Sequence, residues 1–370
     1  MQEIHGGDIY TDRRIRLDFS VNTNPLGMPR QMKERIRGSE ETWERYPDLQ
    51  MRRLRGGLEE FYRKWGAPLC ADWFLAGNGA SDLIYSLAFA LRPERILLIA
   101  PCFSEYERAF SAAGCRTEAF LLTPESGFSL EAARERLFAR LFGPERPDLL
   151  LLASPANPSG RAERAAFLAE LADACGRAGT LLIVDECFVW FAGDAGAYSL
   201  APFLARDPER FRHVILLGAF TKIFSMAGLR FGFAVCPDPG LRRQIEGVRP
   251  PWSVSGPAQE AALAAPDLTA FIRETVRVTG KERAWLAGAL ERLGFFVFPT
   301  SANFLLFRRA EGDETDYAAH CRERGILIRG CAGFSGLDER YCRVAVRTRA
   351  DNEALISCLE EACKEWLRQS

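Results

Sequence analysis

Several features that particular protein classes require are scarce or missing in this 370-residue chain. Its only histidines are His5, His213 and His320, so a histidine-rich transition-metal centre is not expected. Lys and Arg number 48 against 49 for Asp and Glu, and this balance leaves no excess charge to attract nucleic acid or an anionic membrane. No stretch approaches the roughly 18 apolar residues of a membrane-spanning helix. We therefore expect a small-molecule ligand and no metal, nucleic acid or membrane partner.

Signals for disulfides and for export are missing as well. None of the eleven cysteines belongs to a Cys-x-x-Cys pair, and several lie inside apolar runs, which is typical of reduced thiols. The N-terminus, from Met1 to Gly7, lacks the basic region and the apolar stretch of an export signal. These absences predict a cytosolic protein.

Short apolar runs alternate with longer amphipathic segments over the first 250 residues. Buried strands are expected at 95–100, 148–154, 180–185, 214–217 and 231–236. Helices with one apolar face are expected at 81–91, 104–113 and 163–178. This repetition predicts an α/β fold with a mostly parallel sheet that helices cover on both sides.

The pattern changes near Pro250-Pro251-Trp252, which is the best candidate for a linker. A long helix is expected at 267–293. Short strands are expected at 295–298, 303–307, 326–329 and 341–346. We therefore predict a large domain at 46–250 and a smaller α+β domain at 251–370. Residues 1–45, which are rich in turn formers, are predicted to be an arm that joins the small domain.

A lysine follows one of the predicted strands. Thr221-Lys222 leaves the apolar run that ends at Phe220, and a lone lysine in such a place is most often a surface residue. Burial beside a bound cofactor would instead lower the pKa of its amine and let it form a Schiff base with a carbonyl group.

A glycine-rich turn, Gly77 to Asp82, opens one of the predicted helices. Free N–H groups and the positive end of the helix dipole at Gly79, Ala80 and Ser81 would hold a phosphate. Thr221 and Arg230 would add a hydroxyl and a guanidinium to the same phosphate. An ordinary helix start with Ser81 as the N-cap is the alternative interpretation.

Three further strand ends carry groups that suit an aromatic ring cofactor. Asp185 could face a ring nitrogen, Asn157 could hydrogen-bond a ring oxygen, and Phe103 could stack on the ring. Their ordinary interpretations are a metal ligand, an Asn-Pro turn and a core aromatic. The scarcity of histidine disfavours the metal.

Taken in order, these residues resemble a known family, the fold-type I enzymes of the aspartate aminotransferase superfamily that depend on pyridoxal 5′-phosphate (PLP). The resemblance covers essentially the whole chain and is carried by Gly79-Ala80-Ser81, Phe103, Asn157-Pro158-x-Gly160, Asp185-Glu186, Thr221-Lys222, Arg230 and Arg343. It implies that Lys222 carries PLP, with Asp185 at the ring nitrogen and Asn157 at the phenolic oxygen. It also implies that Arg343 takes the substrate carboxylate, and that Tyr46 reaches the cofactor phosphate of the neighbouring subunit in a homodimer.

Two subfamilies share Asn24-Pro25-Leu26-Gly27 and Arg45-Tyr46-Pro47-Asp48: L-threonine-O-3-phosphate decarboxylase and histidinol-phosphate aminotransferase. The chain looks more like the decarboxylases at His5-Gly6-Gly7 and at Phe103-Ser104-Glu105-Tyr106. It also has Phe188 where the aminotransferases tend to have tyrosine. The resemblance implies decarboxylation of threonine phosphate or serine phosphate to an amino-alcohol phosphate for cobamide biosynthesis. Transamination of the histidinol-phosphate type is the alternative.

A phosphorylated substrate needs a cationic site of its own, because the cofactor phosphate already occupies the first one. We predict that His5, Asn24 and Arg329 bind the phosphate of the substrate. Two departures from the usual decarboxylase pattern, Asp8 and Cys331-Ala332-Gly333, bear on the choice of substrate.

Two other classes of function are compatible with the predicted fold. One is a PLP-fold domain that senses a ligand without turnover, but such domains usually come fused to a DNA-binding segment, which is not expected here. The other is a plain nucleotide-binding α/β protein. Visible absorbance of the purified protein that disappears with borohydride would favour the enzyme.

Overall fold

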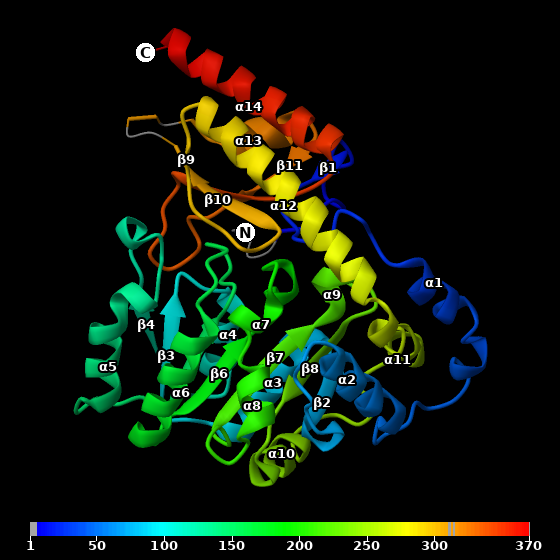
Figure 1. Cartoon of the computed structure of the whole chain (residues 1–370). Coiled ribbons are helices and arrows are strands. Elements are labelled where there is room, and N and C mark those ends of the chain that lie inside the picture. Colours follow the sequence, from blue (N-terminus) through cyan, green and yellow to red (C-terminus); the bar gives the residue numbers. More distant parts are fainter. Residues whose placement is uncertain (1–5, 310–311, 314, 370) are drawn as a thin grey trace.

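A seven-stranded sheet forms the centre of the larger body of the molecule (Figure 1). A computed structural model describes residues 6–309, 312–313 and 315–369, with side chains described up to residue 364. The strand order is β2-β8-β7-β6-β5-β3-β4, and all neighbours are parallel except β8, which is antiparallel to β2 and β7. The strands are β2 (Phe74–Asn78), β3 (Arg95–Ala100), β4 (Arg116–Leu121), β5 (Leu149–Ala153), β6 (Leu181–Asp185), β7 (Val214–Ala219) and β8 (Phe231–Val235).

Helices cover both faces of this sheet, because successive residues of a strand point to opposite sides. Val184 and Leu216 pack in one core with α2 and α6, whereas Ile183 and Leu217 pack in another with α3, α4 and α10. The helices of this body are α2 (Arg52–Lys64), α3 (Gly79–Leu91), α4 (Ser104–Ala112), α5 (Arg134–Phe142), α6 (Ala165–Ala178), α7 (Ala195–Tyr198), α8 (Ala201–Arg206), α9 (Phe220–Ile223), α10 (Pro239–Glu246) and α11 (Gly256–Ala262). The predicted α/β fold with a mostly parallel sheet is confirmed.

A four-stranded antiparallel sheet of order β12-β13-β10-β9 forms the smaller body. Leu286, Leu305, Val344 and Leu359 are fully buried between this sheet and its helices. The elements are α12 (Thr269–Arg292), β9 (Phe296–Val297), β10 (Phe304–Arg308), α13 (Tyr317–Glu323), β12 (Arg329–Gly330), β13 (Tyr341–Ala345) and α14 (Arg349–Gln369).

The N-terminal segment touches both bodies. Its strand β1 (Leu17–Asp18) pairs in parallel with β11 (Ile326–Leu327). The chain then runs down to α1 (Arg30–Arg37), which packs against α11 (Figure 1). Helix α1 belongs to the predicted arm, and α11 belongs to the predicted small domain. The domain limits at residues 45 and 250 stay predictions.

The predicted strands and long helices are present, with ends that differ by at most two residues, except that the strand predicted at 326–329 is two short strands, β11 and β12, in different sheets. Strand β4 was not expected from the sequence. It lies at the edge of the sheet, where Phe120 alone of its six residues is buried, so no continuous apolar run marks it. Among the described residues, no helix is long and apolar enough to cross a membrane.

Candidate active site

The predicted site residues meet at a cavity of about 420 Å³ between the two bodies. Strands β3, β5, β6 and β7 are parallel, so their carboxyl ends share one edge of the large sheet, and that edge forms one side of the cavity. The N-terminal segment and strands β12 and β13 form the other side. The predicted residues that line the cavity are Ala80, Ser81, Phe103, Asn157, Asp185, Thr221, Lys222, Arg230, Arg329 and Arg343.

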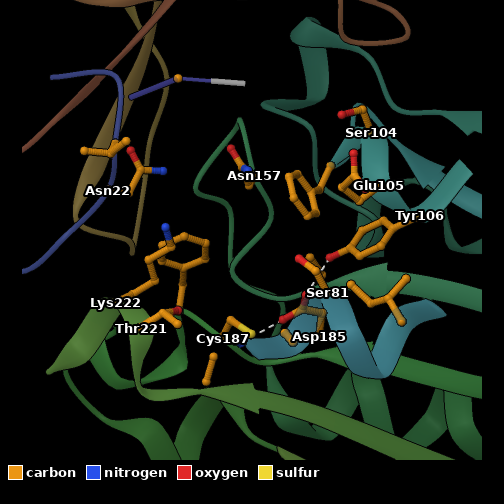
Figure 2. A pocket seen from close by; sticks show the side chains of 18 of the residues that line it. Asn22, Ser81, Ser104, Glu105, Tyr106, Asn157, Asp185, Cys187, Thr221 and Lys222 are labelled. Carbon is orange, nitrogen blue, oxygen red and sulfur yellow. Dashed lines mark hydrogen bonds between the residues drawn. The ribbon is translucent and has the colours of Figure 1, made fainter. Parts of the chain in front are cut away.

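Lys222 lies in the short helix α9, directly after β7, and its amine points into the cavity (Figure 2). The side chain is half-buried. Burial, together with the positive charges of Arg343 and Arg230, lowers the pKa of Lys222 to about 8. A substantial fraction of this amine is therefore neutral near pH 8, as a nucleophile or a base must be.

Asp185 is the last residue of β6 and is 7% exposed. Its Oδ2 accepts a hydrogen bond from the Tyr106 hydroxyl at 2.7 Å, and its Oδ1 accepts one from the Cys187 amide at 2.9 Å. Figure 2 shows Asp185 between Tyr106 and Cys187. The carboxylate is therefore held in one orientation, with donors on both oxygens.

The next residue, Glu186, lies on the opposite side of the chain, away from the cavity. Its carboxyl group accepts hydrogen bonds from the Ser199 hydroxyl at 2.6 Å and from the Leu200 amide at 2.8 Å. Burial raises the pKa of Glu186 to about 7. Alternation along the strand thus brings one carboxyl group to the cavity and the other to the core.

Helix α3 begins at Gly79, with Asn78 in the N-cap position and no side-chain cap. Its first N–H groups can therefore bind an anion. The Arg230 guanidinium approaches so closely that a Cβ on Gly79 would lie 2.7 Å from its Nη2, and Gly79 has a φ of +81°, so this turn requires glycine. Ser81 lies inside the first helical turn, which makes its interpretation as an N-cap wrong.

Asn157 and Arg343 connect the two sides of the cavity. Arg343 Nη1 donates to the Asn157 side-chain oxygen, and Arg343 Nη2 donates to the Ser20 carbonyl at 2.5 Å. Burial lowers the pKa of Arg343 to about 10. Both hydrogen-bond partners of this buried cation are neutral oxygens.

Arg329 lies directly across from Arg343 in the antiparallel pair β12·β13. Residues that face each other in such a pair point to the same side of the sheet, and like charges in these positions repel. Both arginines are buried, Arg329 over the Phe334 ring and Arg343 over the Phe304 ring. Two guanidinium groups therefore share the small-sheet side of the cavity.

Some predicted residues lie elsewhere. Asn24 is not among the described residues that line the cavity: its buried side chain donates to the Ile223 carbonyl at 2.7 Å and to the Thr275 hydroxyl at 2.8 Å, and its predicted contact with the substrate phosphate stays a prediction. Gly79 lies just behind the cavity lining, against Arg230. Tyr46 is 78% exposed and stacks on Trp252, outside the cavity of its own chain. His5 falls outside the described residues.

Two functional candidates were missed. Asn22 lines the cavity with 3% exposure, and its side-chain oxygen has no hydrogen-bond partner within the described part of the chain. Tyr106 also lines the cavity and holds Asp185. Tyr106 lies one turn after Phe103 in α4, and this helical spacing was the available signal. For Asn22, the turn-rich segment carried no periodicity that could separate it from Asn24.

The remaining sequence features also have places in the structure. Phe188 lines the cavity and packs edge-on against Phe304, so no hydroxyl is present at this point. Asp8 accepts hydrogen bonds from the Tyr10 and Thr11 amides and stabilises a turn. Cys331 is fully buried directly after β12, and burial raises the pKa of its thiol to about 12. Neither departure from the decarboxylase pattern lines the cavity.

Comparisons with known proteins agree with this geometry. The model of the family "aminotransferase class I and II" matches residues 14–359. The chain is 34% identical over 364 residues to threonine-phosphate decarboxylase of Salmonella typhimurium strain LT2, covering 96% of this chain and 95% of that protein. It is 30% identical over 355 residues to histidinol-phosphate aminotransferase 1 of Mesorhizobium japonicum, covering 95% and 91%. The crystal structure of histidinol-phosphate aminotransferase from Clostridium acetobutylicum superposes with a TM-score of 0.83 at 26% identity, covering 95% and 100%.

Proposed function

Because the chain belongs to the aminotransferase class I and II family, we propose that it is a PLP-dependent enzyme that decarboxylates L-threonine O-3-phosphate or L-serine O-phosphate. The product would be the corresponding amino-alcohol phosphate, of the kind used in cobamide biosynthesis. The proposal is supported by the cavity's donor set and by its similarity to a threonine-phosphate decarboxylase over nearly the whole chain.

The large-sheet side of the cavity fits PLP. Ser81, Thr221 and Arg230 would hold the cofactor phosphate at the uncapped start of α3. Lys222 would take the aldehyde, and Asp185 would face the ring nitrogen. The remaining contacts would come from Asn157 at the phenolic oxygen and Phe103 on the ring face. When bound, PLP supplies an electron sink for the bond that breaks at the substrate's Cα.

The residues around the cofactor decide which bond to Cα breaks, because only a bond held perpendicular to the ring can pass its electrons to it. In a decarboxylation, Arg343 would hold the carboxylate in that direction, carbon dioxide would leave, and Lys222 Nζ would deliver a proton to Cα. In a transamination, Lys222 Nζ would instead remove the Cα proton. The half-buried, partly neutral Lys222 suits both tasks.

The observation that carries the choice of substrate is the pair Arg329 and Arg343. Both guanidinium groups line the cavity from facing positions on one side of a sheet, so they can bind a ligand with two anionic groups. A phosphorylated amino acid has a carboxylate and a phosphate. Arg343, next to Asn157, would take the carboxylate, and Arg329 would take the phosphate together with Asn22. His5, which is also predicted to bind the substrate phosphate, would add a further contact to that group.

Transamination of the histidinol-phosphate type is the alternative, supported by the similarity to two such aminotransferases. One assay separates the two reactions. The PLP-loaded protein is incubated with phosphothreonine, phosphoserine or histidinol phosphate, while carbon dioxide release and amino transfer to a keto acid are followed in parallel. We expect carbon dioxide from a phosphorylated amino acid. Amino transfer from histidinol phosphate without carbon dioxide release would contradict the decarboxylase proposal.

The quaternary structure and the compartment also belong to this proposal. Tyr46, Trp43 and Trp252 are 78%, 59% and 41% exposed in the single chain, which is costly for aromatic side chains in water. A homodimer in which Tyr46 reaches the partner's cofactor phosphate would cover them. All eleven cysteines are free thiols, which suits a reducing cytosol.

Complementation between two variants tests the dimer. A dimer that combines one Lys222→Ala subunit with one Tyr46→Ala subunit contains one complete site, because the intact lysine and the intact tyrosine come from different chains. Mixing the two variants after partial unfolding and refolding should therefore restore activity that neither has alone. A fully active monomer at assay concentration, or a mixture no more active than its parts, would contradict shared sites.

A further inference from the structure

Tyr106 lines the cavity and contacts two residues that are proposed to bind the cofactor. Its hydroxyl donates to Asp185 Oδ2 at 2.7 Å, and its ring meets Phe103 edge-on with centroids 5.7 Å apart. The tyrosine is 1% exposed and belongs to the core formed by α3, α4 and one face of the large sheet. Figure 2 shows it beside Asp185, on the opposite side of the cavity from Lys222.

The direction of this hydrogen bond is determined by the surroundings. Burial, followed by the negative charge of Asp185, raises the pKa of Tyr106 well above its ordinary value. The phenol therefore keeps its proton and acts as the donor. With the Cys187 amide at 2.9 Å on the other oxygen, each Asp185 oxygen receives one hydrogen bond and keeps a lone pair for a further partner.

We propose that Tyr106 is a positioning residue that holds the Asp185 carboxylate aimed at the ring nitrogen of PLP. The proposal deepens the function argued above and rests on it. A carboxylate that two donors hold in one orientation keeps a lone pair directed at one place, where its charge would stabilise a protonated ring nitrogen. The edge-on contact with Phe103 means that the same side chain also supports the residue expected to stack on the ring.

The Tyr106→Phe variant isolates the hydrogen bond, because it keeps the ring packing and removes only the hydroxyl. Tyr85→Phe is a matched control: the Tyr85 hydroxyl also donates to a buried carboxylate, Glu105 at 3.1 Å, but this hydrogen bond joins α3 to α4. For each PLP-loaded variant, the visible absorbance of the lysine-bound cofactor is titrated with pH, kcat and KM are measured, and thermal unfolding is recorded.

For Tyr106→Phe we expect kcat to fall about tenfold, the worth of one hydrogen bond to a charged group, while KM changes little. Without the phenol, Asp185 loses one of the two donors that orient it, so the carboxylate would stabilise a protonated ring nitrogen less well. The ring then carries less positive charge, so the Lys222 nitrogen that is bonded to the cofactor would keep its proton to a higher pH. The midpoint of the absorbance titration should rise by about one pH unit. Tyr85→Phe should leave both quantities unchanged.

Tyr106→His offers a ring N–H in place of the hydroxyl, so the midpoint of its absorbance titration should lie between those of Tyr106→Phe and the unmodified enzyme. If Tyr106→Phe unfolds at the assay temperature, Tyr106→His provides the test instead. If the midpoint and kcat of Tyr106→Phe equal those of Tyr85→Phe while Asp185→Asn still lowers kcat strongly, Tyr106 merely fills the core and the inference is wrong. If Lys222→Ala and Asp185→Asn leave the absorbance unchanged, the proposed function itself fails.

Discussion

The two sides of the cavity present different sets of charged groups. The large-sheet side presents one carboxylate and one amine: Asp185 accepts hydrogen bonds from Tyr106 and Cys187, and burial lowers the pKa of Lys222. On the small-sheet side, Arg329 and Arg343 face each other across β12 and β13, and the hydrogen bonds of Arg343 go to neutral oxygens.

This difference indicates that one side of the cavity binds the cofactor and the other binds the substrate. The large-sheet side offers a lysine, a carboxylate and an uncapped helix start, which together suit a neutral or zwitterionic ring with one phosphate. The small-sheet side offers two cations and suits a dianionic substrate. Variants of the first side should change the cofactor's spectrum, and variants of the second side should change only the handling of substrate.

The largest effect is expected from Lys222→Ala. Removing the amine should abolish the Schiff-base absorbance and reduce turnover at least ~10³-fold, because covalent attachment of the cofactor and proton transfer at Cα both use that nitrogen. Absorbance spectra and single-turnover rates measure the two consequences separately. Near-normal activity in this variant would contradict the proposed role of Lys222 in catalysis.

Asp185→Asn should have the next largest effect. The amide keeps the shape of the side chain but not its negative charge, so the ring nitrogen loses the group that holds its proton, and we expect kcat to fall roughly 10²-fold or more. Retained secondary structure by circular dichroism shows that the fold is intact. A rate within twofold of the unmodified enzyme would mean that Asp185 only stabilises the end of β6.

Arg329→Ala sharpens the comparison from the other side. Loss of one charge-assisted contact to the substrate phosphate should raise KM for the phosphorylated amino acid about tenfold or more, while the cofactor absorbance stays unchanged. Unphosphorylated threonine and serine are the control substrates, because they lack the group that Arg329 would bind. An equal loss for both kinds of substrate would assign Arg329 a structural role.

The smallest effect concerns Glu186, the carboxyl group next to Asp185 on the core side. Its pKa is raised from 4.5 to about 7 by burial, so folding favours the protonated form. The stability gained from that form is fully present below pH 4.5 and is lost as the pH rises through 7. Over that interval the loss is on the order of 3 kcal/mol, from a shift of roughly 2.5 pH units.

Glu186→Gln removes this charge and should therefore flatten the dependence of unfolding free energy on pH between 4.5 and 7. Denaturant unfolding at several pH values measures it, with the exposed Glu291→Gln as a control that should leave the dependence unchanged. The same slope in Glu186→Gln and in the unmodified protein would show that Glu186 does not titrate on unfolding.

The sequence alone was sufficient for the layered sheet and for most of the cofactor side. Asn157, Asp185 and Lys222 each follow a buried apolar run, and the carboxyl ends of parallel strands meet at one edge, so local pattern and topology together bring them to one cavity. Their chemical roles stay predictions. The edge strand β4 was not predicted, because Phe120 is its single buried residue and the sequence has no continuous apolar run there.

Only the tertiary structure decided the contacts that depend on long-range packing. Asn22 and Asn24 are two residues apart in one irregular segment, yet the first lines the cavity and the second is bound to Ile223 and Thr275. Strand register places Arg329 opposite Arg343, and helix docking brings the Tyr106 hydroxyl to Asp185, 79 residues away. Such contacts depend on how whole elements dock, and no local periodicity in the sequence encodes that docking.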